Sequence, residues 1–187
     1  MLHITLLYGA VREGRQSIRA AKAVENALIA TGKAQVTFID IAQYHLPVME
    51  QRLKDMPNPP EHLLEISHAL ASADGIILAT PEYNNSYSGA LKNAVDYFTK
   101  EWSKKPMGVV TASAGIQGGI NASNLLQLLI LAIDGFAMPT KLLVPEVDKN
   151  ITAEGEVQNE RLAKNINRFV EDFLWFTEAI AKQKIAQ

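Results

Sequence analysis

Residues 75–98 read GIILATPEYNNSYSGALKNAVDYF. The first six, 75–80, are apolar almost throughout, which is typical of a strand buried on both faces of a parallel sheet. A polar loop with a proline follows, and then Leu91, Val95 and Phe98 recur at the spacing of a helix that buries one face. This stretch therefore predicts a strand, a loop and a helix, in the order that a parallel α/β sheet repeats.

The same alternation of strand and helix extends to both ends of the chain. Apolar, β-rich segments predict five strands, at 2–8, 34–40, 75–80, 107–112 and 138–144. Apolar residues spaced by three and four predict helices between and after them, and the clearest such stripe covers 162–180. Because a parallel crossover requires a helix and returns with one hand, this order predicts a parallel sheet with helices on both faces.

The length of the chain, 187 residues with 48% hydrophobic and 20% charged side chains, suits one substantial core. We therefore expect a single domain over residues 1–187. The stretch 41–62 carries four of the eight prolines and little periodicity, so it is expected to be a surface connection.

Composition argues against several classes of protein. A net charge of -2 without a basic tract does not favour nucleic-acid binding. The absence of cysteine excludes disulfides, thiolate metal sites and cysteine nucleophiles. The four histidines form no metal-ligand pattern, so no metal is expected, and the sequence lacks the G-x-S-x-G elbow of many hydrolases.

The segment MLHITLLYGAVREGR at 1–15 reads as a strand entering a turn, and not as a signal peptide. No apolar run reaches the roughly 18 to 20 residues that cross a bilayer. We therefore expect no membrane association and a cytoplasmic protein.

Three loops are expected to meet at one edge of the sheet. Ligands of such sheets bind beyond the carboxyl ends of the strands, where the strand order reverses. The loops after the first, third and fourth strands cover 9–17, 81–89 and 113–119. Each contains residues suited to a ligand, and their expected convergence is stronger evidence than any one of them.

The first loop, GAVREGRQS, concentrates glycine, arginine and a hydroxyl between a strand and a helix. Unpaired amides at a helix start and guanidinium groups attract phosphate. The P-loop is excluded, because Arg15 and Gln16 stand where it needs lysine and then serine or threonine; Val11 likewise excludes the dinucleotide fingerprint. The alternative is a plain turn with solvated arginines, in which Ser17 caps the helix.

The second loop follows the most buried strand, and its Tyr83 offers a flat surface to an aromatic ligand. A turn with a packed tyrosine is the alternative, and Ser88 is expected to cap the next helix. The third loop, SAGIQGG, has three glycines, which permit either close approach to a ligand or a strained turn.

In these motifs the chain resembles the flavodoxin-like NAD(P)H-dependent FMN reductases, the group of azobenzene, quinone and chromate reductases. The resemblance rests on Gly-x-x-Arg-x-Gly at 9–14, on PEYN with SGALKNAVDYF at 81–98, and on S-x-G-x-x-G-G at 113–119. It implies a flavodoxin-like three-layer sandwich whose five-stranded parallel sheet has the order 2-1-3-4-5, and bound FMN with NADPH or NADH as hydride donor.

The resemblance also assigns residues to the cofactor. The phosphate would be held by the first loop, at Gly9, Arg12, Arg15, Gln16 and Ser17. The ring would lie along Pro81, Glu82, Tyr83 and Asn84, with Ser113, Gly115 and Gln117 on its pyrimidine side. The family usually has serine or threonine after the first glycine, and Ala10 departs from this pattern, so phosphate binding would lean more on the arginines.

The expected reaction needs no catalytic side chain, because the chemistry lies on flavin N5. Asp74 and Asp96 are expected in solvated or capping roles. The resemblance implies ping-pong hydride transfer to quinones, azo compounds, flavins or similar small acceptors. The choice between NADH and NADPH stays open, as does the physiological acceptor. The alternatives are a non-enzymatic FMN-binding electron carrier or redox sensor, and a hydrolase or sugar-phosphate enzyme without flavin.

The segment 121–134 is apolar nearly all round, which favours a helix that a partner copy covers. The alternative is that the C-terminal segment of the same chain covers it. The resemblance implies a homodimer or a dimer of dimers, in which the partner helps to shape the nicotinamide pocket.

Overall fold

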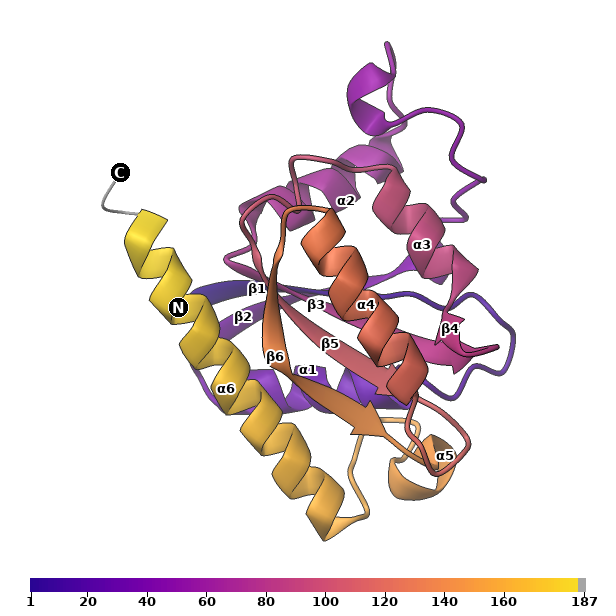
Figure 1. Ribbon diagram of the computed structural model, residues 1–187, viewed down its shortest axis with the longest axis vertical. Coiled ribbons are helices and arrows are strands. Elements are labelled where there is room, and N and C mark those ends of the chain that lie inside the picture. The colour runs from indigo at the N-terminus through magenta and orange to yellow at the C-terminus, as the bar shows by residue number, and fades with distance from the viewer. Residues whose placement is uncertain (185–187) are drawn as a thin grey trace.

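Five parallel strands form the central sheet of the computed structural model, which describes residues 1–184 (Figure 1). They are β1 (Leu2–Tyr8), β2 (Ala34–Asp40), β3 (Gly75–Tyr83), β5 (Pro106–Ala112) and β6 (Phe136–Val144). Their order is β2-β1-β3-β5-β6, and every neighbouring pair is parallel. The main strands therefore follow the predicted order, and the predicted fold class is confirmed.

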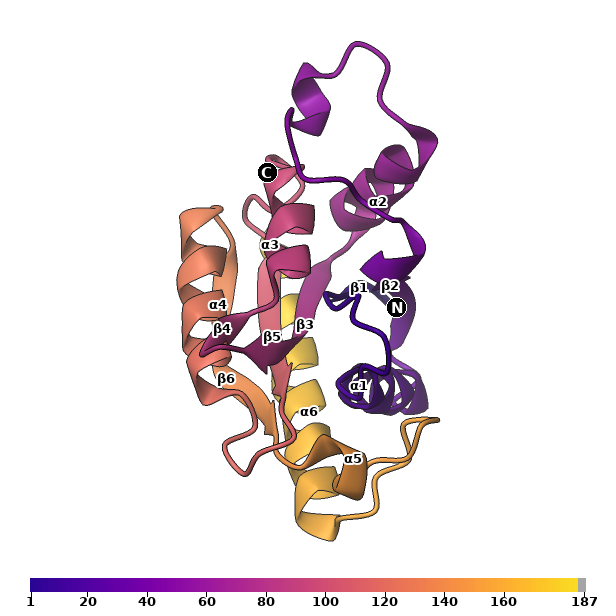
Figure 2. The ribbon, with the colours of Figure 1, turned by 90° about the vertical axis from the view of Figure 1, so that its right-hand side faces the viewer.

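Helices cover both faces of this sheet, as Figure 2 shows from the side. One buried cluster joins the sheet to α1 (Ile18–Ala30) and α6 (Glu160–Lys184). The other joins its opposite face to α2 (Glu61–Ser72), α3 (Gly89–Asp96) and α4 (Ile120–Ala132). A short helix, α5 (Val147–Asn150), follows β6.

The end of β3 differs from the prediction of a loop from Pro81. Residues Glu82 and Tyr83 pair with a two-residue antiparallel strand, β4 (Ser86–Tyr87), which the sequence did not predict. Asn84 and Asn85 form the tight turn between them, with φ angles of 49° and 63°. Asparagine tolerates this left-handed conformation better than most residues, which explains why the hairpin forms here.

The segment 41–62 lies beyond the sheet and contains two short 3-10 helices, η1 (Ile41–Gln43) and η2 (Leu53–Asp55), before α2 begins. Hydrogen bonds fasten it to α3 and to the residue after it. The Asn93 amide group donates to the Pro47 carbonyl at 2.7 Å and accepts from the Met49 N–H at 2.8 Å. The Leu53 N–H donates to the Tyr97 carbonyl at 2.8 Å. The segment is thus anchored although it carries little periodicity.

On the long helix α6, four residues of the predicted stripe, Leu162, Ile166, Phe169 and Phe173, are buried against the sheet, whereas Phe176 and Ile180 are only partly buried. Its opposite face is rich in charge. No helix within residues 1–184 is both long enough and apolar enough to cross a bilayer.

Contact between α6 and the sheet depends on a glycine. A Cβ atom added to Gly75 would lie 2.7 Å from the Thr177 hydroxyl oxygen and 3.0 Å from a ring carbon of Phe173. Both of these side chains are fully buried. We expect Gly75→Ala to lower the free energy of unfolding by roughly 1–3 kcal/mol, because the helix must shift outward.

Chemical denaturation measures this loss, and Gly89→Ala is the matched control. Gly89 has no heavy atom within 4 Å of an added Cβ. The control should leave stability unchanged or raise it by up to about 1 kcal/mol. Equal losses in both variants would contradict the close packing of α6.

Candidate functional site

A cavity of about 380 Å³ opens at the carboxyl edge of the sheet, where the three predicted loops converge. Its walls are residues 12–17, 81–83, 112–114 and 147–148. A second hollow of about 480 Å³ shares 12–16 and extends to Lys22 and Ala153. A larger hollow, of about 830 Å³, lies at the opposite edge between Lys33 and Trp175 and borders none of these loops. The cavity of about 380 Å³, which the three loops line, is therefore the candidate site.

Most of the predicted site residues line this cavity. They are Arg12, Arg15, Gln16, Ser17, Pro81, Glu82, Tyr83 and Ser113. The remaining four, Gly9, Asn84, Gly115 and Gln117, do not line it. Gly9 instead packs under α3, where a Cβ would lie 2.4 Å from the Leu91 Cβ, and Asn84 forms the hairpin turn.

Two wall residues, Val147 and Asp148, were missed by the sequence analysis. They follow β6, and the carboxyl end of this strand opens on the same edge as the other three. That topological rule was the signal that would have found them.

The first loop presents unpaired backbone amides at the start of α1. Ser17 occupies the N-cap position, but its side chain caps no amide of α1. Its hydroxyl is instead hydrogen-bonded to the Tyr8 hydroxyl at 2.7 Å. Among residues 1–184, the N–H groups of Gln16, Ser17 and Ile18 find no acceptor. The predicted alternative of Ser17 as a side-chain cap is therefore wrong, and the helix start is open to an anion.

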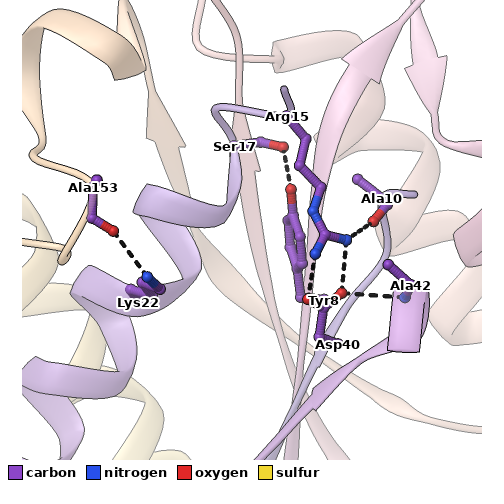
Figure 3. Close-up of polar contacts among 8 residues, drawn as sticks. All are labelled: Tyr8, Ala10, Arg15, Ser17, Lys22, Asp40, Ala42 and Ala153. Carbon is purple, nitrogen blue, oxygen red and sulfur yellow. Dashed lines mark hydrogen bonds and ion pairs between the residues drawn. The ribbon is translucent and has the colours of Figure 1, made fainter. Parts of the chain in front are cut away.

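The two arginines of this loop have different surroundings, and Figure 3 shows those of Arg15. The Arg15 guanidinium forms two parallel contacts with the Asp40 carboxylate, one of them at 2.7 Å, and also donates to the Ala10 carbonyl. It lies 5.1 Å from the centre of the Tyr8 ring. The Arg12 side chain, by contrast, is exposed, and its guanidinium has no hydrogen bond or ion pair within the described chain.

Burial raises the pKa of Tyr8 above its ordinary value of 10.0. The hydrogen bond from Ser17 and the charge of Arg15 oppose this effect but do not overcome it. The Tyr8 hydroxyl therefore stays neutral beneath the loop at ordinary pH, and it serves as a fixed partner for Ser17.

The third loop also offers unpaired donors. The Ser113 hydroxyl donates to the Gly115 carbonyl at 2.9 Å, which holds the turn. The amides of Gly115, Ile116 and Gln117 have no acceptor within residues 1–184. Although they lie outside the cavity wall, these N–H groups suit a ligand with a polar ring edge.

The second loop is fastened from both ends. The Glu82 carboxylate accepts from the Ala122 N–H at 2.9 Å, at the start of α4. The Ser88 hydroxyl accepts from the Leu91 N–H at 3.0 Å, which confirms the predicted cap of α3, and it donates to the Gly9 carbonyl. These bonds hold Pro81 to Tyr83 in place at the cavity.

An open helix start, a free cationic side chain and a tyrosine ring together suit a phosphorylated ligand with a flat aromatic group. Combined with this strand order, the site defines a flavodoxin-like nucleotide-binding protein. Comparison with known proteins identifies the family. The model of the NADPH-dependent FMN reductases matches residues 2–149, and the chain belongs to this family.

Individual relatives agree with this assignment. An NAD(P)H-dependent FMN reductase of Nectria sp is 34% identical over 154 residues, which cover 78% of this chain and 76% of the relative. A 2-hydroxy-1,4-benzoquinone reductase of Burkholderia sp is 28% identical over 178 residues, which cover 92% of this chain and 94% of the relative. An FMN-dependent NADPH-azoreductase of Staphylococcus saprophyticus is 28% identical over 144 residues, covering 66% and 76%.

A solved structure is also similar. The flavoenzyme FerB of Paracoccus denitrificans, an NAD(P)H:acceptor oxidoreductase, superposes with a TM-score of 0.83 at 25% identity and covers 96% of this chain and 98% of its own. The predicted family is confirmed, and the protein is an FMN-dependent oxidoreductase that uses NAD(P)H.

The buried tyrosine leads to a prediction about alkaline stability. Above pH of about 10, Tyr8 ionises in the unfolded chain but not in the folded one, because its folded pKa is raised. This contribution to stability is fully present below pH 10 and is lost as the pH rises further. At pH 7 we expect Tyr8→Phe to have a free energy of unfolding about 1 kcal/mol below that of the wild type, because Ser17 loses its hydrogen-bond partner. Between pH 9 and 11 the free energy of unfolding of the variant should fall less than that of the wild type.

Urea unfolding across this pH range measures both effects. Parallel stability curves for the two proteins would contradict the burial of a neutral Tyr8 hydroxyl.

Proposed function

We propose that this protein oxidises NADH or NADPH and reduces quinones, azo compounds or flavins, with FMN held at the carboxyl edge of the sheet. The observation that carries the proposal is the convergence of three loops on one cavity, with open amides at the start of α1. The activities for which the relatives are named, which include quinone and azo reduction, support the range of acceptors.

The residues of the cavity fit the parts of FMN. The Arg12 guanidinium and the N–H groups of residues 16–18 would hold the phosphate, because these donors are unpaired and the guanidinium carries a positive charge. Pro81 to Tyr83 would lie along the ring. The amides of Gly115 and Gln117 would donate to its polar edge from the turn that Ser113 holds.

When bound, FMN supplies the redox chemistry, taking hydride from the nicotinamide and delivering the electrons to the acceptor. The chain's own part is to orient the ring and to keep one of its faces open. Donors near Gly115 would stabilise negative charge at the ring edge. The proton that a quinone or azo acceptor takes up together with the hydride would come from solvent, so no side chain has to supply it.

The test is an anaerobic absorption titration of the purified protein with FMN, followed by NADPH or NADH. We expect flavin bands that bleach with at least one nucleotide and recover when a quinone is added. Bound flavin that neither nucleotide bleaches would favour an electron carrier or redox sensor. Absence of flavin binding would contradict the proposal.

We also propose that the protein is a homodimer that buries the outer face of α4. Leu128 and Leu131 on this helix are each 62% exposed, and Leu125 is 39% exposed. The described part of α6 packs with α1 on the other face of the sheet, so it does not cover α4. We further propose a cytoplasmic location, because the proposed donors, NADH and NADPH, are found inside cells.

The double variant Leu128→Glu/Leu131→Glu is expected to be monomeric, because two carboxylates would have to be buried in the interface. Sedimentation velocity measures the assembly. The control is Leu64→Glu, which places a charge on α2 at a leucine that is 47% exposed. A wild-type monomer, or a variant that still dimerises, would contradict this interface.

A further inference from the structure

We propose that Arg15 does not contact the phosphate of FMN but positions the phosphate loop through Asp40, which leaves Arg12 as the cation that meets the phosphate. This inference rests on the proposed function, since it concerns how FMN is held. It also revises the role that the family resemblance gave to Arg15.

The first argument is the cost of releasing Arg15. Its side chain is 18% exposed and that of Asp40 only 7%. The two form a fork-to-fork ion pair, and the guanidinium also bonds the Ala10 carbonyl and faces the Tyr8 ring. A guanidinium that turned toward a ligand would leave the Asp40 carboxylate buried and unpaired, which is strongly unfavourable.

The second argument is what these contacts hold together. Tyr8 and Asp40 are the last residues of β1 and β2 and lie opposite each other in the parallel ladder. Arg15 connects Asp40 to the Ala10 carbonyl, and the Tyr8 hydroxyl is hydrogen-bonded to the Ser17 hydroxyl. The open amides of Gln16 and Ser17 lie directly after Arg15. The network therefore fixes the part of the backbone that would receive the phosphate.

The third argument concerns Ala10, whose side chain has no hydroxyl to offer to the loop or to a phosphate. Ala10 is fully buried, and its carbonyl accepts from the Arg15 guanidinium. The arginine thus supplies a contact to the loop that no side chain at position 10 provides.

The fourth argument is the charge that remains for the ligand. Two cationic side chains line the cavity, and Arg15 is neutralised by Asp40. Arg12 is exposed and has no ion pair within the part of the chain that the structure describes. It is therefore the guanidinium available to a phosphate dianion without breaking another contact.

The two possible roles of Arg15 predict opposite effects of Asp40→Asn on the affinity for FMN. If Arg15 were a phosphate ligand, Asp40→Asn would remove a competing carboxylate and strengthen FMN binding. If Arg15 positions the loop, the same substitution breaks the fork and weakens FMN binding, on the order of ten-fold. Affinities for FMN and for riboflavin, which lacks the phosphate, are measured by fluorescence titration of each apoprotein.

Three further variants complete the set. Arg15→Lys keeps the charge but loses the fork, so it should weaken FMN binding as Asp40→Asn does. The double variant Arg15→Lys/Asp40→Asn should be no weaker than either single variant, because both act on one contact. Arg12→Gln should weaken FMN binding by about ten-fold or more, and all variants should bind riboflavin within about three-fold of the wild type.

Thermal unfolding of each apoprotein shows which variants are folded, and Asp40→Glu, which keeps a carboxylate but moves it out of the paired geometry with Arg15, carries the test if Asp40→Asn does not fold. FMN binding by either variant that equals or exceeds the wild type would overturn the proposal. So would a loss of riboflavin binding equal to the loss of FMN binding, since that would indicate a general structural role. A wild-type protein that binds neither flavin would instead contradict the proposed function.

Discussion

Parallel pairing on both sides of β1 is the constraint on which the site depends. Residues 2–8 pair with β2 along one edge, and 4–8 pair with β3 along the other. The chain therefore moves outward from β1 to β2, and it must cross back over β1 to reach β3. Loops after β1 and β3 leave the sheet toward opposite faces, and a hollow forms between them. Every group in the candidate site lies where it does because the strands end at this common edge.

Polar contacts then join the cavity to elements that take no part in it. The Glu82 carboxylate bonds the first turn of α4, and Asn121 of that helix donates to Asn85 of the hairpin at 3.2 Å. The loop that would support the ring is thus attached to the helix with the exposed apolar face. The proposed assembly face and the proposed cofactor loop are therefore joined at α4 by these two hydrogen bonds.

The sequence alone determined the fold class, the five parallel strands and the family. Strands 2–8 and 34–40 have the predicted bounds, because apolar runs between glycine and polar turns are local signals. The three loops were also predicted to meet, since parallel topology places the ends of the strands at one edge. The extension of β3 through Tyr83 was not predicted, because it depends on pairing with β4.

Only the tertiary structure decided how the groups within those loops are used. Arg12 and Arg15 are equivalent in the sequence, but one is exposed and the other is paired with a carboxylate 25 residues away. Ser17 reads as a helix cap, yet its hydroxyl bonds Tyr8. Local sequence records which groups can donate or accept, and long-range packing determines which partners reach them. The physical reason is that a hydrogen bond or ion pair depends on distance in space, which spacing along the chain does not specify.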